Sequence, residues 1–182
     1  MDYSLATDVH YDGDGRAVAA GIAFADWTSD RIARTEIVPI ADVAPYRPGH
    51  FYERELPCLL TLLERLDPLP ATILVDGYVT LGTDGRDGLG AHLHRALDGR
   101  VPVIGIAKTR FAGTPAGTEI YRGRSTRPLY VTSRGIALDE AKRLVRAMHG
   151  RNRLPTLVAA ADRACREASQ AASLLPAMRP PR

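Results

Sequence analysis

Three carboxylates and one lysine occupy positions at which an enzyme could use them. Asp76 ends the apolar run ILVD (73–76), Asp8 lies within the apolar segment 3–11, and Glu55 lies in the predicted helix 51–66. Lys108 follows a second apolar run, VPVIGIA (101–107). Functional groups of an α/β sheet gather where its strands end. If the first and fourth strands are neighbours in the sheet, Asp8 and Asp76 face one another.

Carboxylates this close repel one another unless a cation lies between them. Mg²⁺ prefers oxygen ligands, keeps several waters, and binds through one or two carboxylates plus phosphate oxygens. A lysine at the mouth of the adjacent strand adds a point charge for a phosphate. These residue types therefore suit metal-assisted phosphodiester hydrolysis. The alternative for Asp76 is a turn or a helix cap, because Asp-Gly is a common turn dipeptide.

The elements that must position these groups alternate in type along the chain. Apolar segments 3–11 and 16–27 flank YDGDG, which is typical of a reversal between antiparallel strands, and a third strand follows over 31–40. The helix 51–66, the strands 71–76 and 101–107 and a helix near 88–99 indicate a right-handed parallel crossover. A hairpin (118–123 and 127–133) and the helices 137–150 and 155–175 follow. This order predicts an α/β fold with a mixed central sheet, an antiparallel meander plus parallel strands, flanked by helices.

Composition limits the class of protein. The 182 residues are 45% hydrophobic and 25% charged, which predicts one domain over 1–175, followed by a flexible tail, 176–182. The two cysteines lie in apolar helical segments, which argues against a disulfide framework or a four-ligand zinc site. No apolar run approaches the ~20 residues of a membrane span, and the first residues lack the pattern of a signal peptide. We therefore expect a cytoplasmic monomer that does not enter a membrane.

Arginines are concentrated late in the chain. The formal net charge is only +3, but RGRSTRPLY and DEAKRLVRAMHGRNRLP carry many of them, including Arg124, Arg127, Arg151 and Arg153. Such a distribution suits a polyanionic partner. The alternative is a solvated arginine-rich face.

Five motifs resemble the endonuclease V family in the same order, from about residue 5 to about residue 165. They are TDVHY (7–11), PYRPG with a following RE (45–55), ILVDG (73–77), IGIAKTR (104–110), and LYVTSRGIALDEAKRLV running into MHGRNRLPT (129–156). The resemblance implies a ribonuclease H-like fold and dependence on Mg²⁺ or Mn²⁺. It also implies nicking of nucleic acid near hypoxanthine, the product of adenine deamination, on the 3′ side of the lesion.

The resemblance also assigns roles to residues. Asp8 and Asp76 match the metal-binding aspartates, Glu55 matches the catalytic glutamate, and Lys108 matches the active-site lysine, whereas Glu53 does not match.

The segment 45–49 resembles a wedge that separates strands beside a flipped base. Tyr46 would be its aromatic tip, and a proline-stiffened backbone loses little entropy when it inserts. The alternative for Tyr46 is a half-buried loop tyrosine. The residues that the resemblance assigns to substrate binding are Pro45, Tyr46, Pro48, Gly49 and Gly77.

The sequence departs from the family after Asp76. Val79 replaces a second glycine, and Gly82 stands where the family has a histidine of the lesion pocket, although a glycine lets backbone approach a base closely. Asp84 and Asp87 in this loop are interpreted as turn residues.

The resemblance also implies a further acid beside the metal on the last helix. Direct alignment puts Ala160 at that position, while Asp162 lies two residues on, a rotation of roughly 200° on a straight helix. Asp162 can therefore serve as a metal ligand only if the helix adopts a different register.

These residues leave three functions open. The first is a Mg²⁺-dependent endonuclease acting on DNA that contains deaminated adenine. The second keeps the metal chemistry but acts on inosine-containing RNA, another lesion or another structured nucleic acid, because the loop after Asp76 is altered. The third is a nucleic-acid-binding homologue without turnover, against which the retained carboxylates and lysine argue.

Overall fold

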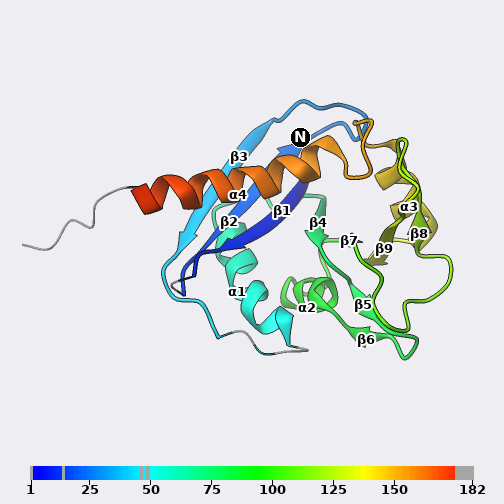
Figure 1. Cartoon of the computed structure of the whole chain (residues 1–182), viewed down its shortest axis with the longest axis horizontal. Helices are drawn as coiled ribbons and strands as arrows, with labels where there is room; N and C mark the ends of the chain where they lie inside the picture. Colours follow the sequence, from blue (N-terminus) through cyan, green and yellow to red (C-terminus); the bar gives the residue numbers. More distant parts are fainter. Residues whose placement is uncertain (1, 14, 46, 48–49, 175–182) are drawn as a thin grey trace, which may run out of the picture.

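The computed structural model describes residues 2–13, 15–45, 47 and 50–174 (Figure 1). Its elements, in chain order, are β1 (Ser4–Tyr11), β2 (Ala17–Phe24), β3 (Arg34–Ile40), α1 (Phe51–Leu63), β4 (Thr72–Asp76), β5 (Thr80–Leu81), β6 (Arg86–Asp87), α2 (Leu89–Ala96), β7 (Val103–Ala107), β8 (Glu119–Ile120), β9 (Leu129–Arg134), α3 (Leu138–Ala147) and α4 (Thr156–Leu174). The predicted tail, 176–182, lies outside the described residues.

One mixed sheet organises the molecule. In the described part of the chain its strand order is β3-β2-β1-β4-β7-β9-β8. The pairs β1–β2 and β2–β3 are antiparallel, β1–β4 and β4–β7 are parallel, and β9 runs antiparallel to both β7 and β8. The predicted meander, parallel crossover and late hairpin are therefore confirmed.

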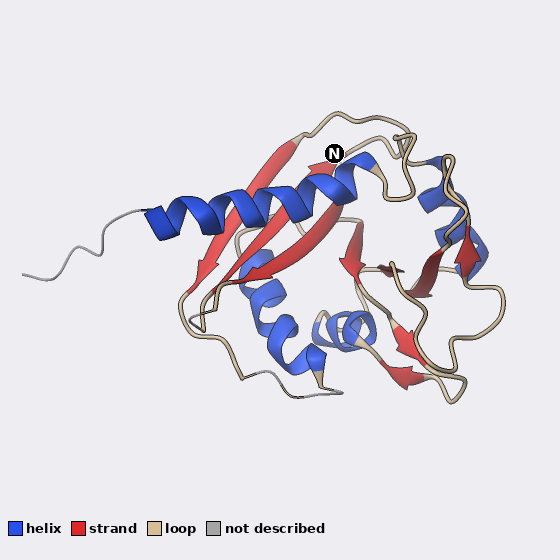
Figure 2. Cartoon of the chain, in the orientation of Figure 1, coloured by secondary structure: helices blue, strands red, loops and turns tan. Residues whose placement is uncertain are grey.

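Helices cover both faces of the sheet (Figure 2). Strand residues alternate between the two faces, so Leu5 joins the core under α1 and α2, while Ala6 joins the core under α3 and α4. In α1 the buried residues Cys58, Leu59 and Leu62 follow helical spacing. These two apolar layers fix the sheet between the helices and leave its strand ends at the surface.

Two local predictions need correction. The third strand begins at Arg34 instead of residue 31, because Arg34 is the first residue of this strand to pair with β2, opposite Ala23. The loop after Asp76 also contains the short antiparallel pair β5–β6, which was not predicted from the sequence. Gly82 and Gly85 have φ of +67° and +66°, a conformation that glycine adopts readily, and they allow the tight reversal between these strands.

Among the helices that the structure describes, none combines the length and apolarity needed to span a membrane.

Candidate active site

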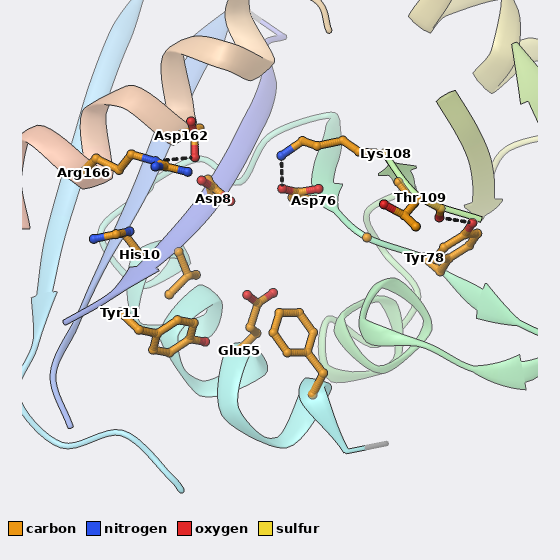
Figure 3. A pocket seen from close by; sticks show the side chains of 14 residues that line it. Asp8, His10, Tyr11, Glu55, Asp76, Tyr78, Lys108, Thr109, Asp162 and Arg166 are labelled. Carbon is orange, nitrogen blue, oxygen red and sulfur yellow. Dashed lines mark hydrogen bonds and ion pairs between the residues drawn. The ribbon is translucent and has the colours of Figure 1, made fainter. Parts of the chain in front are cut away.

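A cavity of about 860 Å³ opens where β1, β4 and β7 end (Figure 3). Its charged lining residues are Asp8, Glu55, Asp76, Lys108, Asp162 and Arg166. The structure thus brings together the four predicted catalytic residues and the predicted third metal-side acid.

The register of the parallel strands places Asp8, Asp76 and Lys108 close together at one edge of the sheet. Ala6 on β1 pairs with Leu74 on β4, so two further residues along each strand lead to Asp8 and Asp76. Asp76 in turn pairs with Ile106 on β7, and Lys108 follows two residues later. Because side chains alternate with a period of two, these three groups project on the same side of the sheet.

A close ion pair joins two of them. Lys108 Nζ lies 2.6 Å from Asp76 Oδ2. Burial lowers the pKa of Lys108, but its hydrogen bond to Asp76 and the negative charge of that residue outweigh this effect and raise the pKa overall. The lysine is therefore held in its cationic form beside the cavity.

Glu55 reaches the cavity from α1. It lies three residues before Cys58 and four before Leu59 on the buried side of the helix, and it is only 7% exposed. Burial raises its pKa well above the ordinary value, and the charges of Asp8 and Asp76 add to the rise.

Glu53, two residues earlier on the same helix, has a different environment. It forms surface ion pairs with Arg47 at 2.9 Å and with His50 at 3.1 Å, and it lies in the first turn of the helix. Negative charge is favoured there by the helix dipole. The structure thus places Glu55 in the cavity and leaves Glu53 at the surface.

Asp8 lies beside two other carboxylates of the cavity, Asp76 and Asp162. Burial raises its pKa to about 7, with further contributions from Asp76 and Asp162, while a hydrogen bond from Cys165 opposes the rise. The Cys165 thiol donates to Asp8 Oδ2 at 3.4 Å. Without a further cation, Asp8 is thus harder to ionise than an ordinary aspartate.

The register of α4 brings Asp162 into the cavity. Ala160 is 7% exposed and packs into the core beneath α3 and α4, whereas Asp162 lines the cavity beside Asp8. Arg166, one turn later, donates from Nε to Asp162 Oδ1 at 2.9 Å. Burial raises the pKa of Asp162, but the hydrogen bond and charge of Arg166 outweigh this effect and lower it overall.

The predicted substrate-binding residues are only partly described. Tyr46, Pro48 and Gly49 lie outside the described residues, so the wedge prediction remains a prediction. Pro45 is exposed. Gly77 lines the cavity with φ of +135°, and its N–H donates to Ile106 O at 3.1 Å. This conformation is one that side chains rarely adopt, which explains a glycine directly after Asp76.

The loop after Asp76, where the sequence departs from the family, packs against the rest of the domain. Val79 is fully buried, and its N–H donates to the Thr132 hydroxyl at 2.8 Å. Asp84 forms an ion pair with Arg86 at 3.1 Å.

Asp87, the second acid of this loop, makes ion pairs with two arginines. It pairs with Arg134 at 3.1 Å and with Arg95. The hydrogen bond from Arg95 lowers the pKa of Asp87. Both extra acids thus have structural partners in the described residues.

Sequence reasoning did not identify Tyr11, Tyr78, Cys165 or Arg166 as part of the site. The Tyr78 hydroxyl donates to Thr109 O at 2.9 Å and accepts from the Phe111 N–H at 3.2 Å, and so ties the loop after Lys108 to the loop after Asp76. For Tyr11 a signal existed, since it lies three residues after Asp8 in the TDVHY motif. No pattern in the sequence points to Cys165, because its proximity to Asp8 spans 157 positions.

The donor set fits an oxygen-preferring divalent metal. Among the described residues, no three His, Cys, Asp or Glu side chains come close enough together to hold one ion. Mg²⁺ does not need three, because it binds through one or two carboxylates, waters and phosphate oxygens. Asp8 and Asp76 provide such a pair; burial and then repulsion from Asp76 raise the pKa of Asp8, and a bound cation would offset that repulsion.

Comparison with known sequences identifies relatives over most of the chain. The sequence profile described as Endonuclease V matches residues 1–125. An endonuclease V from Nostoc punctiforme is 28% identical over 183 aligned positions, which cover 90% of this chain and 81% of that protein. Other relatives, at 35% and 37% identity, are matched over only 43% and 51% of their own length.

Solved structures share the fold. The catalytic domain of human endonuclease V superimposes with a TM-score of 0.78 at 27% identity, covering 96% of this chain and 85% of that one. Endonuclease V of Ciona intestinalis, solved with a DNA 24mer containing an inosine followed by a ribo-adenosine, has a TM-score of 0.76 at 18% identity. That superposition covers 94% of this chain and 87% of the Ciona chain.

The mixed sheet, its flanking helices and the carboxylates at the strand ends define a nuclease of the ribonuclease H-like fold. The profile match covers more than half of the sequence. The chain belongs to the endonuclease V family, whose members are metal-dependent endonucleases.

Proposed function

We propose that this protein hydrolyses a phosphodiester bond of nucleic acid next to deaminated adenine, with Mg²⁺ or Mn²⁺ as its metal. The carrying observation is the cavity in which Asp8, Glu55, Asp76 and Lys108 meet. We propose further that it acts as a cytoplasmic monomer. Its two cysteines are buried and free, which suits a reducing compartment.

Asp8 and Asp76 are the residues that would hold the metal, with Asp162 beside Asp8. When bound, the metal supplies a lowered pKa for an attacking water and offsets charge that builds on the leaving oxygen. Arg166 keeps Asp162 ionised and directed toward Asp8 through the 2.9 Å ion pair. Cys165, on the buried side of α4, donates a hydrogen bond from its thiol to Asp8.

Glu55 is proposed as the group that accepts a proton from the attacking water. Its burial raises its pKa well above the ordinary value, which makes its ionised form a stronger base. Lys108 provides the positive charge that attracts the phosphate, since an ammonium acts as a point charge toward phosphate oxygens. The ion pair with Asp76 holds this ammonium in place before substrate binds.

The identity of the base that the enzyme recognises is a separate part of the proposal. The Ciona relative was solved with inosine-containing DNA, which supports an inosine substrate for the family. In this chain Val79 and Gly82 alter the loop, so RNA or another lesion is the second candidate substrate.

Cleavage of a labelled oligonucleotide that carries one inosine tests the proposal. Its unmodified twin, a version with a ribonucleotide after the inosine, and uracil and abasic versions are compared, each with Mg²⁺ and with chelator. We expect a metal-dependent nick on the 3′ side of inosine and none in the twin. Cleavage of only another substrate would move the specificity to it. Inosine-directed binding without any nick would support the non-catalytic alternative.

A further inference from the structure

Some arginines of this protein form ion pairs with carboxylates, whereas the exposed arginines on the loops next to Lys108 do not, in the part of the chain that the structure describes. Within the described residues, carboxylates form ion pairs with Arg16, Arg34, Arg47, Arg86, Arg95, Arg100, Arg134, Arg143 and Arg166. Four exposed arginines on the loops that follow β7, β8 and α3 have no such partner in this part of the chain: Arg110, Arg124, Arg127 and Arg151. We call these four the arginine surface.

The sequence of these loops contains almost no negative charge that could neutralise them. Residues 108–128 include one acid, Glu119, and residues 149–155 include none. Acids of the neighbouring β5–β6 hairpin are already paired, Asp84 with Arg86 and Asp87 with Arg95 and Arg134. The positive charge of the arginine surface is therefore available to an external anion.

The loops that carry the arginine surface are held together by a buried arginine. Arg122 is 6% exposed and donates to the carbonyl oxygens of Met148, Asn152 and Arg153. Gly123, with φ of +57°, lies directly against the backbone of Arg151, where a Cβ atom would not fit. The loop of Arg124 and the loop of Arg151 thus form one unit, and Figure 1 shows them side by side.

A second arginine joins this unit to the active site. Arg153 donates to Lys108 O at 3.2 Å and to Pro128 O at 3.4 Å. Arg110 follows Lys108 by two residues. The arginine surface is consequently anchored to the same strand end that presents the lysine to the cavity.

We propose that the arginine surface binds the phosphate backbone of the nucleic acid that flanks the scissile phosphate on the Lys108 side. A polymer whose reacting phosphate lies at Lys108 must leave the cavity past neighbouring loops, and these loops carry the guanidinium groups without acidic partners. Guanidinium forks bind phosphate oxygens with well-defined geometry, and such contacts position a nucleic acid without reading its sequence. This inference rests on the proposed nuclease function.

Salt dependence of binding provides the test, because each phosphate neutralised by a cation steepens it. The variant R124Q/R127Q/R151Q removes three charges of the surface and spares Arg110, which is close to Lys108. A matched control, R31Q/R65Q/R100Q, removes three exposed arginines on other loops. Binding of an inosine-containing duplex is measured in chelator, so that no cleavage occurs, between about 50 and 200 mM KCl.

We expect the slope of log K against log salt to become less negative by about 2 to 3 in the surface variant, since each phosphate contact contributes about 0.9. The control should keep both the wild-type slope and the wild-type cleavage rate at saturating substrate. A wild-type slope in a surface variant that unfolds at the normal temperature would overturn the inference, as would an equal change in the control. Failure of the nuclease proposal is recognised separately, by the absence of cleavage by the wild-type protein.

Discussion

Two groups of acids in this protein contrast in their partners. In the cavity, the half-buried Asp8 and the buried Glu55 lie beside other carboxylates, and loss of solvent raises the pKa of both. In the β5–β6 hairpin, Asp84 and Asp87 lie beside arginines, and the hydrogen bond from Arg95 lowers the pKa of Asp87. The charges of the hairpin acids are balanced by their ion pairs with arginines, which indicates a structural role. The cavity, in contrast, is lined by more acidic than basic side chains.

This contrast distinguishes acids with a functional role from acids with a structural role, although the residue types alone do not. Asp76 and Asp87 are both the last residues of short strands, but Asp76 lines a cavity with further acids whereas Asp87 pairs with arginines. Carboxylates that repel one another in a cavity are costly unless a cation joins them, and perturbed pKa values of this kind gather at functional sites. The comparison yields four predictions.

The largest effect is expected from removing a cavity charge. Asp76→Asn should lower the cleavage rate at least about 1,000-fold, because loss of metal-assisted charge stabilisation costs several kcal/mol. Asp87→Asn is the matched control: it should leave cleavage unchanged and lower the free energy of unfolding by only about 0.5–1 kcal/mol. Single-turnover cleavage and urea unfolding provide the two measurements. Equal cleavage by the two variants would remove the distinction between the groups.

The two glutamates of α1 sharpen the same comparison within one helix. Glu55→Gln should reduce the cleavage rate by about 100-fold or more, the range of general base catalysis. Glu53→Gln loses only the surface pairs with Arg47 and His50 and should cleave like wild type. Substrate affinity measured in chelator should be similar for both. A Glu55→Gln variant that cleaves at the wild-type rate would exclude Glu55 as the proton acceptor.

Metal-free stability should depend on pH with opposite signs in the two groups. Asp8 has a pKa of about 7 in the folded state against an ordinary 3.8, so folding favours its protonated form. Its contribution is fully present below about pH 4 and is lost as the pH rises toward 7, by about 1–3 kcal/mol. The lowered pKa of Asp87 gives the reverse, with stability present above pH 3.8 and lost at lower pH.

Urea unfolding in chelator from pH 3 to pH 8 measures both contributions. Asp8→Asn should reduce the loss of stability as the pH rises from 4 toward 7, with the remainder due to Glu55, whose pKa is also raised, and Asp87→Asn should leave that loss in place. Mg²⁺ should stabilise the wild-type protein more at pH 8 than at pH 5, because the carboxylates must be ionised to bind it. A loss of stability of unchanged size in Asp8→Asn would assign it to other groups, with Glu55 the first to examine.

The smallest effect is expected for an uncharged group in the cavity. The Tyr11 hydroxyl is buried without a hydrogen-bond partner among the described residues, and the Arg54 guanidinium lies 3.7 Å from the centre of its ring. Tyr11→Phe keeps the ring and removes the hydroxyl, so the free energy of unfolding should stay constant or rise by up to about 1 kcal/mol. A fall of that size in thermal or urea unfolding would mean that the hydroxyl has a partner in solution.

Much of the fold could be predicted because it depends on local patterns. Continuous apolar runs such as ILVD and VPVIGIA predict buried parallel strands, and the helical spacing of Leu59 and Leu62 predicts α1. The β5–β6 pair was missed because each strand has two residues, too few to show a period. The wedge prediction at 45–49 falls largely outside the described residues and stays a prediction.

The site could be predicted where a motif carries it, and the contacts between motifs could not. Asp8, Glu55, Asp76 and Lys108 were identified from strand ends and motif order, and all four line one cavity. Alignment placed Ala160 at the position of the further metal-side acid, and Asp162 two residues beyond it. Packing of Ala160 against the sheet decides the rotation of α4, and that rotation turns Asp162 toward Asp8.

The sequence by itself determined the elements, their order and the residues that can do chemistry, because periodicity and motif spacing act over short stretches of chain. Only the tertiary structure decided which acids lie in the same cavity and which are paired with arginines, because Asp8 meets Cys165 across 157 positions and Arg134 meets Asp87 across 47. Such distances in sequence carry no local signal. The charge balance of each acid is set by the neighbours that folding brings to it.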